Sequence, residues 1–195
     1  MRRTKFNRHY VPNLAAYLES NWARVSRNID AMDATVERFA SVRHYGSLSR
    51  ARLWRIGYIK STRKSELLKQ NNSAKVREVT RKAFQASNEK ERIILLCSLN
   101  GVSVPRASSV LSWTHPEKWP VIDQRAWRTL RRFDVVTCYD RGTGLGPLQW
   151  AVFVEAVDAL CKVVKGGSLS PQQMDRLLYQ EDKDEELRKR RLKAA

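Results

Sequence analysis

The chain has 195 residues, 42% of them hydrophobic, which is enough for one core of ordinary size or for two lobes that share a cleft. Its 37 Lys and Arg against 20 Asp and Glu give a formal net charge of +17, which favours a polyanionic partner. An acidic membrane surface is the competing partner, but no apolar run approaches the ~20 residues that span a bilayer. No apolar segment typical of a secretory signal follows the basic start, so we expect a cytoplasmic protein.

The three cysteines, Cys97, Cys138 and Cys161, are far apart, and each lies within or beside an apolar pattern. This arrangement predicts reduced thiols rather than a disulfide framework, a zinc site or an iron–sulfur cluster. The three histidines share no ligand-like spacing either. We therefore expect no metal and no cofactor built on these side chains.

Helical spacing of apolar residues begins after residues 1–9, which are basic and expected to be loose. From residue 10 to residue 43 the spacing fits two helices joined near Ser20 and Asn21, or one long kinked helix. Further helices are expected over 50–64 and 74–86.

Residues 50–64 interleave basic side chains with Trp54 and Tyr58. Such a segment can bind nucleic acid, because aromatic rings stack on bases while Arg and Lys contact phosphates. It also fits an amphipathic helix that buries its apolar side chains and extends its basic ones into solvent. Both readings stay open, because one face can pack while the other contacts DNA.

The stretch 88–133 organises the rest of the chain. Asn88 can cap a helix whose Glu91 can reach back, and that helix ends before Gly101, which has the backbone freedom for a sharp reversal. A second helix follows with Pro105 in its first turn, where no intrahelical N–H is needed. The pattern predicts a helix, a tight hairpin and a second helix.

Beyond this hairpin, Pro116 and Pro120 interrupt the chain, and Asp123, 22 positions after Gly101, opens a further helix. The glycine-rich loop over 134–147 has no preceding strand and no Gly-Lys-Ser/Thr, so it indicates a linker or substrate-side loop rather than a phosphate loop.

The last part of the chain predicts a helix over 148–164 that ends at Gly166 and Gly167. A final helix begins at a cap formed by Ser170 and continues into a charged, solvated tail over 182–195. Because no convincing β alternation is present, we predict a single all-α domain over 1–195.

The segment 88–133 resembles the helix-hairpin-helix DNA glycosylase superfamily. In that family a similar hairpin is followed, at about this spacing, by a Val-Asp pair whose carboxylate is catalytic. The resemblance implies two helical lobes that flank a DNA-binding cleft. The residues that match are Leu99, Gly101, Val102, Ala107, Leu111, Pro120, Val121, Asp123 and Arg128.

The resemblance implies that the hairpin binds the DNA backbone, often with a monovalent cation in this family, and that a base is extruded into a pocket. Asp123 would then stabilise the oxocarbenium ion and activate water, although capping of the helix that it opens also explains an Asp here. The two roles can coexist. The residues expected to bind the DNA backbone are Gly101, Val102, Ser103, Val104 and Arg106. Those expected at the base pocket or on DNA are Trp119, Gln124, Arg125, Trp54, Lys60 and Arg63.

Three departures from the family pattern limit which kind of glycosylase we expect. Ser103 replaces the second hairpin glycine, Pro105 stands where the lyase branch has its Schiff-base Lys, and the four-cysteine cluster is missing. The resemblance therefore implies a monofunctional glycosylase without an iron–sulfur cluster, with Lys60 and Lys118 as the remaining candidates for an amine.

We therefore expect a monomeric DNA glycosylase that removes a damaged or modified base, in base excision repair or in defence against modified foreign DNA. The alternative is a non-catalytic helix-hairpin-helix module that binds DNA phosphates. A third alternative is a basic helical protein that binds RNA or another protein.

Overall fold

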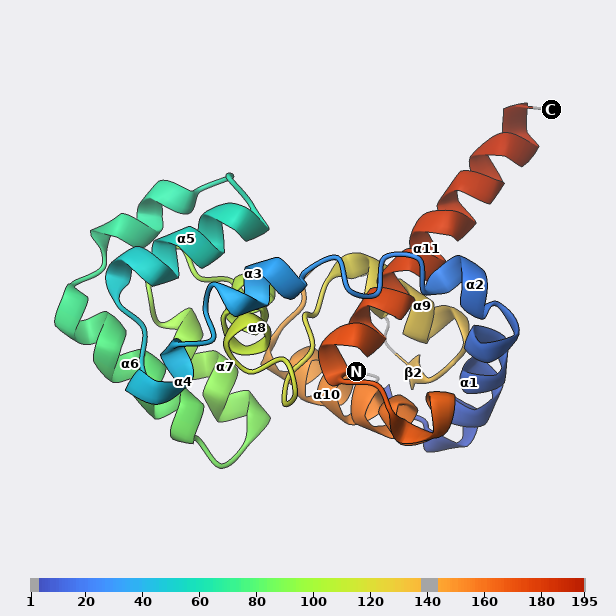
Figure 1. Ribbon diagram of the computed structural model, residues 1–195, viewed down its shortest axis with the longest axis horizontal. Coiled ribbons are helices and arrows are strands. Elements are labelled where there is room, and N and C mark those ends of the chain that lie inside the picture. The colour runs from blue at the N-terminus through green and yellow to red at the C-terminus, as the bar shows by residue number, and fades with distance from the viewer. Residues whose placement is uncertain (1–3, 138–143, 195) are drawn as a thin grey trace.

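The computed structural model describes residues 4–137 and 144–194, and this part of the chain is mostly helical, as the spacing predicts (Figure 1). The longer helices are α1 (Val11–Ser20), α5 (Arg50–Lys60), α6 (Ser73–Gln85), α7 (Glu89–Cys97), α8 (Val104–Thr114), α9 (Gln124–Arg132), α10 (Pro147–Cys161) and α11 (Pro171–Ala194). The shorter ones are α2 (Trp22–Val25), α3 (Asp33–Glu37), α4 (Val42–Tyr45) and the 3₁₀ helices η1 (Arg8–Tyr10), η2 (Ser65–Gln70) and η3 (Val164–Gly167).

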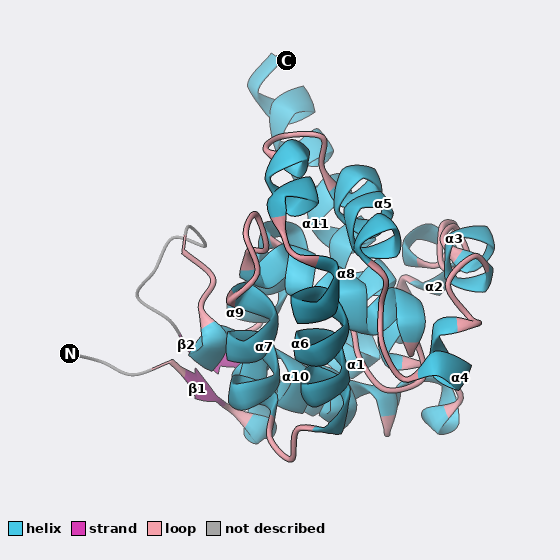
Figure 2. Cartoon of the chain, turned by 90° about the vertical axis from the view of Figure 1, so that its left-hand side faces the viewer, coloured by secondary structure: helices cyan, strands magenta, loops and turns pink. Residues whose placement is uncertain are grey.

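Two short strands, β1 (Lys5–Phe6) and β2 (Val136–Thr137), correct the expectation that the chain lacks strands, and β1 also corrects the expectation of a loose start for the part of residues 1–9 that is described. They pair in antiparallel orientation near the start of the chain (Figure 2). The backbone N–H of Asn7 extends the pair by donating to the Val135 carbonyl at 2.8 Å. Strands of two residues are too short to leave a detectable alternation in the sequence.

The helices form two lobes (Figure 1). One lobe holds α4, α5, α6, α7 and α8, and the other holds α1, α2, α9, α10, α11 and the strand pair. Helix α7 packs against α6 within its own lobe and against α10 of the other, so it connects the two. Helix α3 lies between the lobes and contacts α8, while the last turns of α11 project from the body.

The join expected near Ser20 and Asn21 is confirmed, because α1 ends at Ser20. The prediction of a long helix over the rest of 10–43 is wrong, because this stretch forms the short helices α2, α3 and α4 with turns between them. Side chains of this stretch bond α11 instead: Asn28 donates to the Gln180 side chain at 2.8 Å, and Asp30 accepts from the Gln173 side chain at 3.1 Å.

The predicted hairpin is confirmed between α7 and α8. Asn88 caps α7, because its side chain accepts the Glu91 N–H at 2.9 Å. Gly101 has φ +77°, in the left-handed region that favours glycine. A Cβ at Gly101 would lie 2.9 Å from Leu67 Cβ and 3.2 Å from the Leu68 nitrogen, so the hairpin backbone packs directly on η2.

Asn71 fixes this contact between the hairpin and η2. Its side chain is buried, donates to the Asn100 carbonyl at 3.0 Å and accepts the Asn100 N–H at 2.8 Å. The adjacent Asn72 caps α6 by accepting the N–H groups of Ala74 and Lys75 at 2.8 and 3.2 Å. The polar residues between η2 and α6 are therefore structural.

The cap predicted at the start of α11 is confirmed, because Ser170 and Gln173 exchange hydrogen bonds of 3.1 and 3.2 Å. The expectation of a solvated tail over 182–195 is wrong at its start, since Asp182 is 3% exposed and is covered by arginines of α9. In the loop expected over 134–147, residues 138–143 lie outside the described part of the chain. Among the residues described, no helix combines the length and apolar character needed to cross a membrane.

Candidate functional site

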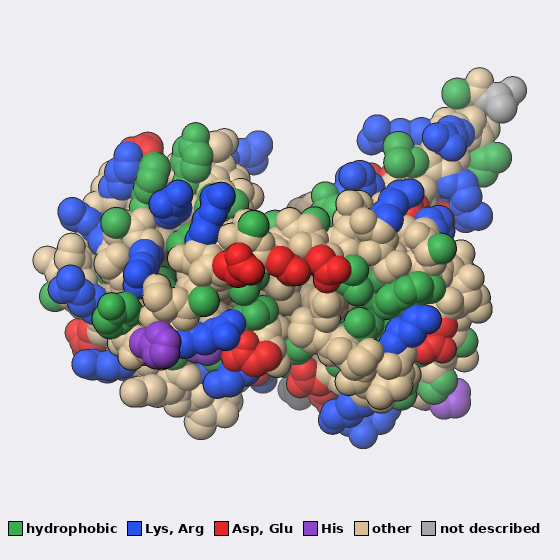
Figure 3. All heavy atoms as spheres, in the orientation of Figure 1, with side chains coloured by type: hydrophobic (Ala, Val, Ile, Leu, Met, Phe, Trp, Pro, Cys, Tyr) green, Lys and Arg blue, Asp and Glu red, His purple; other side chains and the backbone are tan. Residues whose placement is uncertain are grey.

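A groove of about 840 Å³ runs along the hairpin. One wall carries Lys60, the last residue of α5, and Arg63 and Lys64 of the turn after it, and the other wall is the hairpin backbone around Gly101. Gln124, at the start of α9, closes one end. The predicted positions Lys60, Arg63 and Gln124 therefore come together beside the hairpin. Figure 3 shows Lys and Arg side chains over the lobe that contains α5 and along the projecting end of α11, while acidic side chains gather over α3.

The hairpin and the start of α8 carry unpaired backbone donors, and two of their residues, Gly101 and Ser103, line this groove. In the described residues, the N–H groups of Gly101, Ser103 and Val104 have no hydrogen-bond acceptor. They lie at the N-terminal end of α8, where the helix dipole favours an anion. Val102 was also expected to bind the DNA backbone, but its N–H is not available, because it donates to the Leu99 carbonyl at 3.1 Å inside the turn.

The prediction that Arg106 binds the DNA backbone also needs correction. Its side chain is buried, and the guanidinium donates to the carbonyls of Gly101 at 2.7 Å and Ser61 at 3.0 Å. A third bond goes to the Arg63 carbonyl. Arg106 therefore joins the hairpin to the turn after α5, and its charge is used on backbone carbonyls rather than on a phosphate.

Replacing Arg106 with Met is expected to lower the free energy of unfolding by about 1.5–3 kcal/mol, because the carbonyls lose a charged hydrogen-bond donor. Urea denaturation followed by circular dichroism measures the change. Arg55→Met is the matched control, since Arg55 lies on α5 and is exposed. Equal midpoints for the two variants would contradict the structural role of Arg106.

A cavity of about 210 Å³ adjoins the groove where α5, α8 and α11 meet, and Lys60 lines both. It therefore lies between the two lobes. Its walls combine apolar and aromatic side chains with two carboxyl groups. The other lining residues are Met32, Ile59, Trp113, Val121, Asp123, Asp175, Arg176 and Tyr179.

Asp123 lines this cavity and also caps α9. Its Oδ1 accepts the Ala126 N–H at 2.9 Å, which fixes the orientation of the carboxylate. No described residue donates a hydrogen bond to its Oδ2. The capping role considered for this residue is therefore confirmed, while its catalytic role stays a prediction that the unpaired Oδ2 leaves open.

Asp175 is the second carboxyl group of the cavity, and the sequence analysis missed it. It is 5% exposed, and its Oδ2 accepts the Val121 N–H at 2.5 Å. Burial raises the pKa of Asp175 to about 8, against the lowering effect of that hydrogen bond, so the carboxyl is protonated at neutral pH. One sequence feature could have revealed Asp175: it stands next to Met174 and three residues before Leu178, on the apolar face of α11 that turns inward.

The tryptophan of the cavity is Trp113 rather than the expected Trp119. Trp119 donates from Nε1 to Glu89 at 3.2 Å and lies under the Arg92 guanidinium, 4.5 Å from its ring centroid, so it belongs to the α7 surface. Trp113 is 3% exposed and packs against Phe39, and its Nε1–H has no acceptor in the described part of the chain.

Trp54 and Arg125 are likewise placed outside the cavity wall. Trp54 is absent from the residues that line the cavity, and the Lys69 amine of η2 lies 4.6 Å from its ring centroid, where η2 packs on α5. Arg125 forms ion pairs with Asp182 at 3.3 Å and Glu186 at 2.8 Å on α11. It contacts the cavity only indirectly, through the ring of Tyr179, whose centroid lies 5.6 Å away.

Arg125 belongs to a larger group that we call the α9–α11 cluster. Two of its acidic members, Glu181 and Asp182, are 2% and 3% exposed, whereas Glu186 and the arginines keep 28–36% of their side chains exposed, so these ion pairs are partly buried. The cluster holds α11 against α9 and so positions the cavity wall carried by α11. Its members are Arg125, Arg128, Arg132, Glu181, Asp182 and Glu186.

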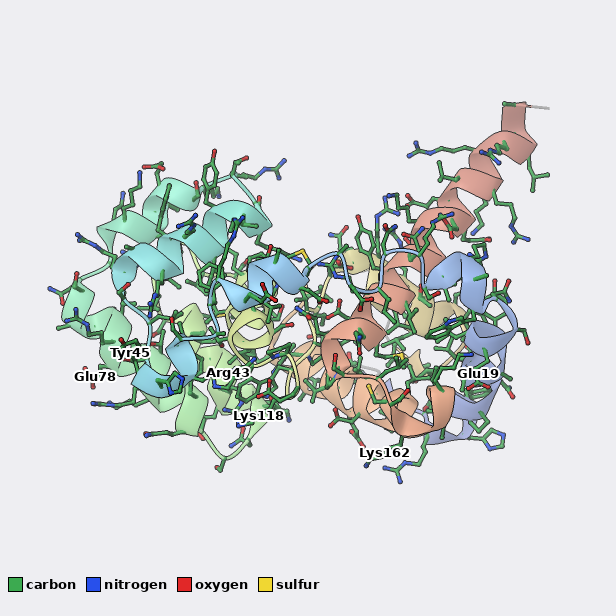
Figure 4. All side chains as sticks on the ribbon, viewed as in Figure 1. Glu19, Arg43, Tyr45, Glu78, Lys118 and Lys162 are labelled. Carbon is green, nitrogen blue, oxygen red and sulfur yellow. The ribbon has the colours of Figure 1, made fainter. Side chains whose placement is uncertain are left out.

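Of the two amines considered from the sequence, only Lys60 lines the cavity. Lys118 lies instead beside Trp119, 5.9 Å from its ring centroid (Figure 4). Burial raises the pKa of Cys97 to about 11 and that of Cys161 to about 12, which suppresses thiolate chemistry. Within the described ranges, no three His, Cys, Asp or Glu side chains are grouped to hold a metal ion.

No protein-family model, curated protein or solved structure matches this chain. The molecule is a mostly helical protein in which a hairpin groove opens beside a cavity with two carboxyl groups.

Proposed function

We propose that this protein is a monofunctional DNA glycosylase, which hydrolyses the N-glycosidic bond of a damaged or modified base extruded from DNA. The observation that supports this most directly is the position of Asp123, in a cavity that adjoins the hairpin groove. Such an activity serves base excision repair or defence against foreign DNA with modified bases.

DNA binding begins at the groove. A backbone phosphate accepts hydrogen bonds from the free N–H groups of Gly101, Ser103 and Val104, at the positive end of α8. Lys60 and Arg63 on the facing wall neutralise neighbouring phosphates. These contacts fix the position of the strand without reading its sequence.

The extruded base enters the adjoining cavity. Enzymes that act on a base inside a duplex turn it out of the stack and hold it between aromatic or apolar side chains. Trp113, Tyr179 and Met32 provide such walls here. Because Lys60 borders both the groove and the cavity, the bound phosphate and the extruded base lie next to each other.

Asp123 supplies the chemistry. Cleavage of the glycosidic bond develops positive charge on the sugar, which a carboxylate stabilises while it orients or deprotonates the attacking water. The hydrogen bond from Ala126 holds Oδ1, so Oδ2 can face the sugar and water. Asp175 is uncharged at neutral pH, so Asp123 provides the negative charge.

The test is base release from duplexes that each carry one modified base. We expect wild-type protein to release a free base, detected by mass spectrometry, and to leave an abasic strand that breaks only after alkali. Borohydride added during the reaction is expected to trap no protein–DNA adduct, because Pro105 occupies the position of the lyase amine.

Two results would change this assignment. A borohydride adduct that disappears in Lys60→Gln would make Lys60 a nucleophile and the protein a lyase, since Lys60 lines the cavity. Tight DNA binding without release of any base would favour the non-catalytic helix-hairpin-helix module, for which the backbone donors of the groove suffice.

A further inference from the structure

The cavity contains two polar groups that the proposed hydrolysis does not use. The first is the indole N–H of Trp113, a residue that lines the cavity; this N–H is buried and has no acceptor among the described residues. Buried donors are almost always paired, so an unpaired donor on a cavity-lining side chain is available to a ligand that accepts a hydrogen bond.

The second group is the Asp175 carboxyl, which enters from the opposite lobe on α11. Its Oδ2 already accepts the Val121 N–H, and no other described residue donates to this carboxyl. When the group is protonated, the hydrogen is on Oδ1, because Oδ2 accepts the N–H. Oδ1–H is then a second donor for a cavity ligand.

The surroundings of Asp175 keep it protonated at neutral pH. Burial is the largest cause of its pKa of about 8, and the negative charge of Asp123 acts in the same direction. Lys60 on α5 and Arg176 on α11 act in the opposite direction. Tyr179 on α11 lines the same cavity, and Cys161 on α10 lies near Asp175 with its pKa raised by burial to about 12, so that thiol is uncharged at neutral pH.

We propose that Trp113 and Asp175 determine substrate specificity by donating hydrogen bonds to the carbonyl oxygen of an oxo-substituted base. This inference rests on the proposed glycosylase function. A base that places an exocyclic amino group at the same position leaves both donors unpaired and adds a third. Sites built to hydrogen-bond a substrate reject analogues that lack the matching group far better than apolar pockets do.

The test measures recognition separately from bond cleavage. Wild-type protein is bound to a duplex with a tetrahydrofuran abasic site, which leaves the cavity open, and free bases are titrated while tryptophan fluorescence is recorded. Uracil is compared with cytosine, and hypoxanthine with adenine. We expect each oxo base to bind at least about tenfold more tightly than its amino counterpart.

Three variants assign this preference to the two donors. Trp113→Phe keeps the aromatic packing against Phe39 and removes the N–H, and Asp175→Leu removes the carboxyl, so each is expected to reduce the preference. Asp175→Asn retains an N–H donor. The wild-type preference is expected to fall above pH 8, where the carboxylate can only accept, whereas that of Asp175→Asn is expected to persist.

Binding of each variant to the abasic duplex at the groove shows that it is folded. Equal affinities for the two kinds of base, preference for the amino bases, or failure of all four to bind would overturn the proposal. Absence of base release in the earlier assay would instead remove the glycosylase function, so the two failures are distinguishable.

Discussion

Asp123→Asn is expected to reduce single-turnover base release by about 10²–10⁴-fold while DNA affinity stays unchanged. Asn retains an oxygen that can accept the Ala126 N–H, so α9 keeps its cap. The variant loses the negative charge beside the sugar and the base that activates water. Release is measured by mass spectrometry, and DNA affinity by fluorescence anisotropy.

The same substitution at Asp33 is the control, because Asp33 lies exposed on α3 and does not line the cavity. Base release by Asp33→Asn should equal that of the wild type. If Asp123→Asn releases base at the wild-type rate, Asp123 has no part in the mechanism. If release falls only in proportion to the loss of folded protein, Asp123 acts as a helix cap alone.

Gly101→Ala should destabilise the protein by on the order of 2–4 kcal/mol and weaken binding to DNA of every sequence. Part of the cost is the left-handed backbone, with φ +77°. The rest is steric, because the new Cβ lies 2.9 Å from Leu67 Cβ and 3.2 Å from a backbone nitrogen of η2. Urea denaturation and anisotropy titrations measure the two effects.

Gly46→Ala separates these causes. Gly46 also has positive φ, +59°, but a Cβ there meets nothing within 4 Å. Its cost is expected to be about 1–2 kcal/mol, the backbone term alone, with DNA binding intact. Equal costs at Gly46 and Gly101 would show that packing on η2 is unimportant. A Gly101 variant with altered sequence preference would mean that the hairpin reads bases.

The parts of the fold that the sequence predicted well are those decided by neighbouring residues. The cap at Asn88, the reversal at Gly101 and the box of Ser170 with Gln173 all involve residues at most three positions apart. The strand pair and the broken stretch after Asn21 were missed. Two-residue strands leave no pattern, and the number of turns depends on what α2, α3 and α4 pack against.

The same division applies to the candidate site. The sequence analysis found Asp123 and Lys60 because spacing and charge are visible in the sequence. Asp175 and Tyr179 lie far from them in the sequence and reach the cavity only because α11 packs against α9 and α10. Trp119 was chosen because it precedes Asp123 closely in sequence, but its ring packs on the α7 surface instead.

The arginines show that the net charge does not reveal which cations are available to bind a ligand. Arg106 binds backbone carbonyls and Arg125 binds acidic residues of α11, so neither charge is available to a phosphate. A composition gives the number of cations but not their partners. The cations that line the groove are Lys60 at the end of α5, Arg63 and Lys64 in the turn after it, and the backbone-bound Arg106.

The α9–α11 cluster has a consequence for work at different ionic strengths. Dissolved ions screen exposed charges strongly and buried pairs weakly, and Glu181 and Asp182 are almost fully enclosed. Lys60, Arg63 and Lys64 of the groove reach solvent, and the phosphate contacts proposed for them would weaken steeply as salt displaces them. Under the proposed function, we therefore expect concentrated salt to release the DNA while the cavity keeps its shape. Binding of the duplex and selection of the base can then be measured separately.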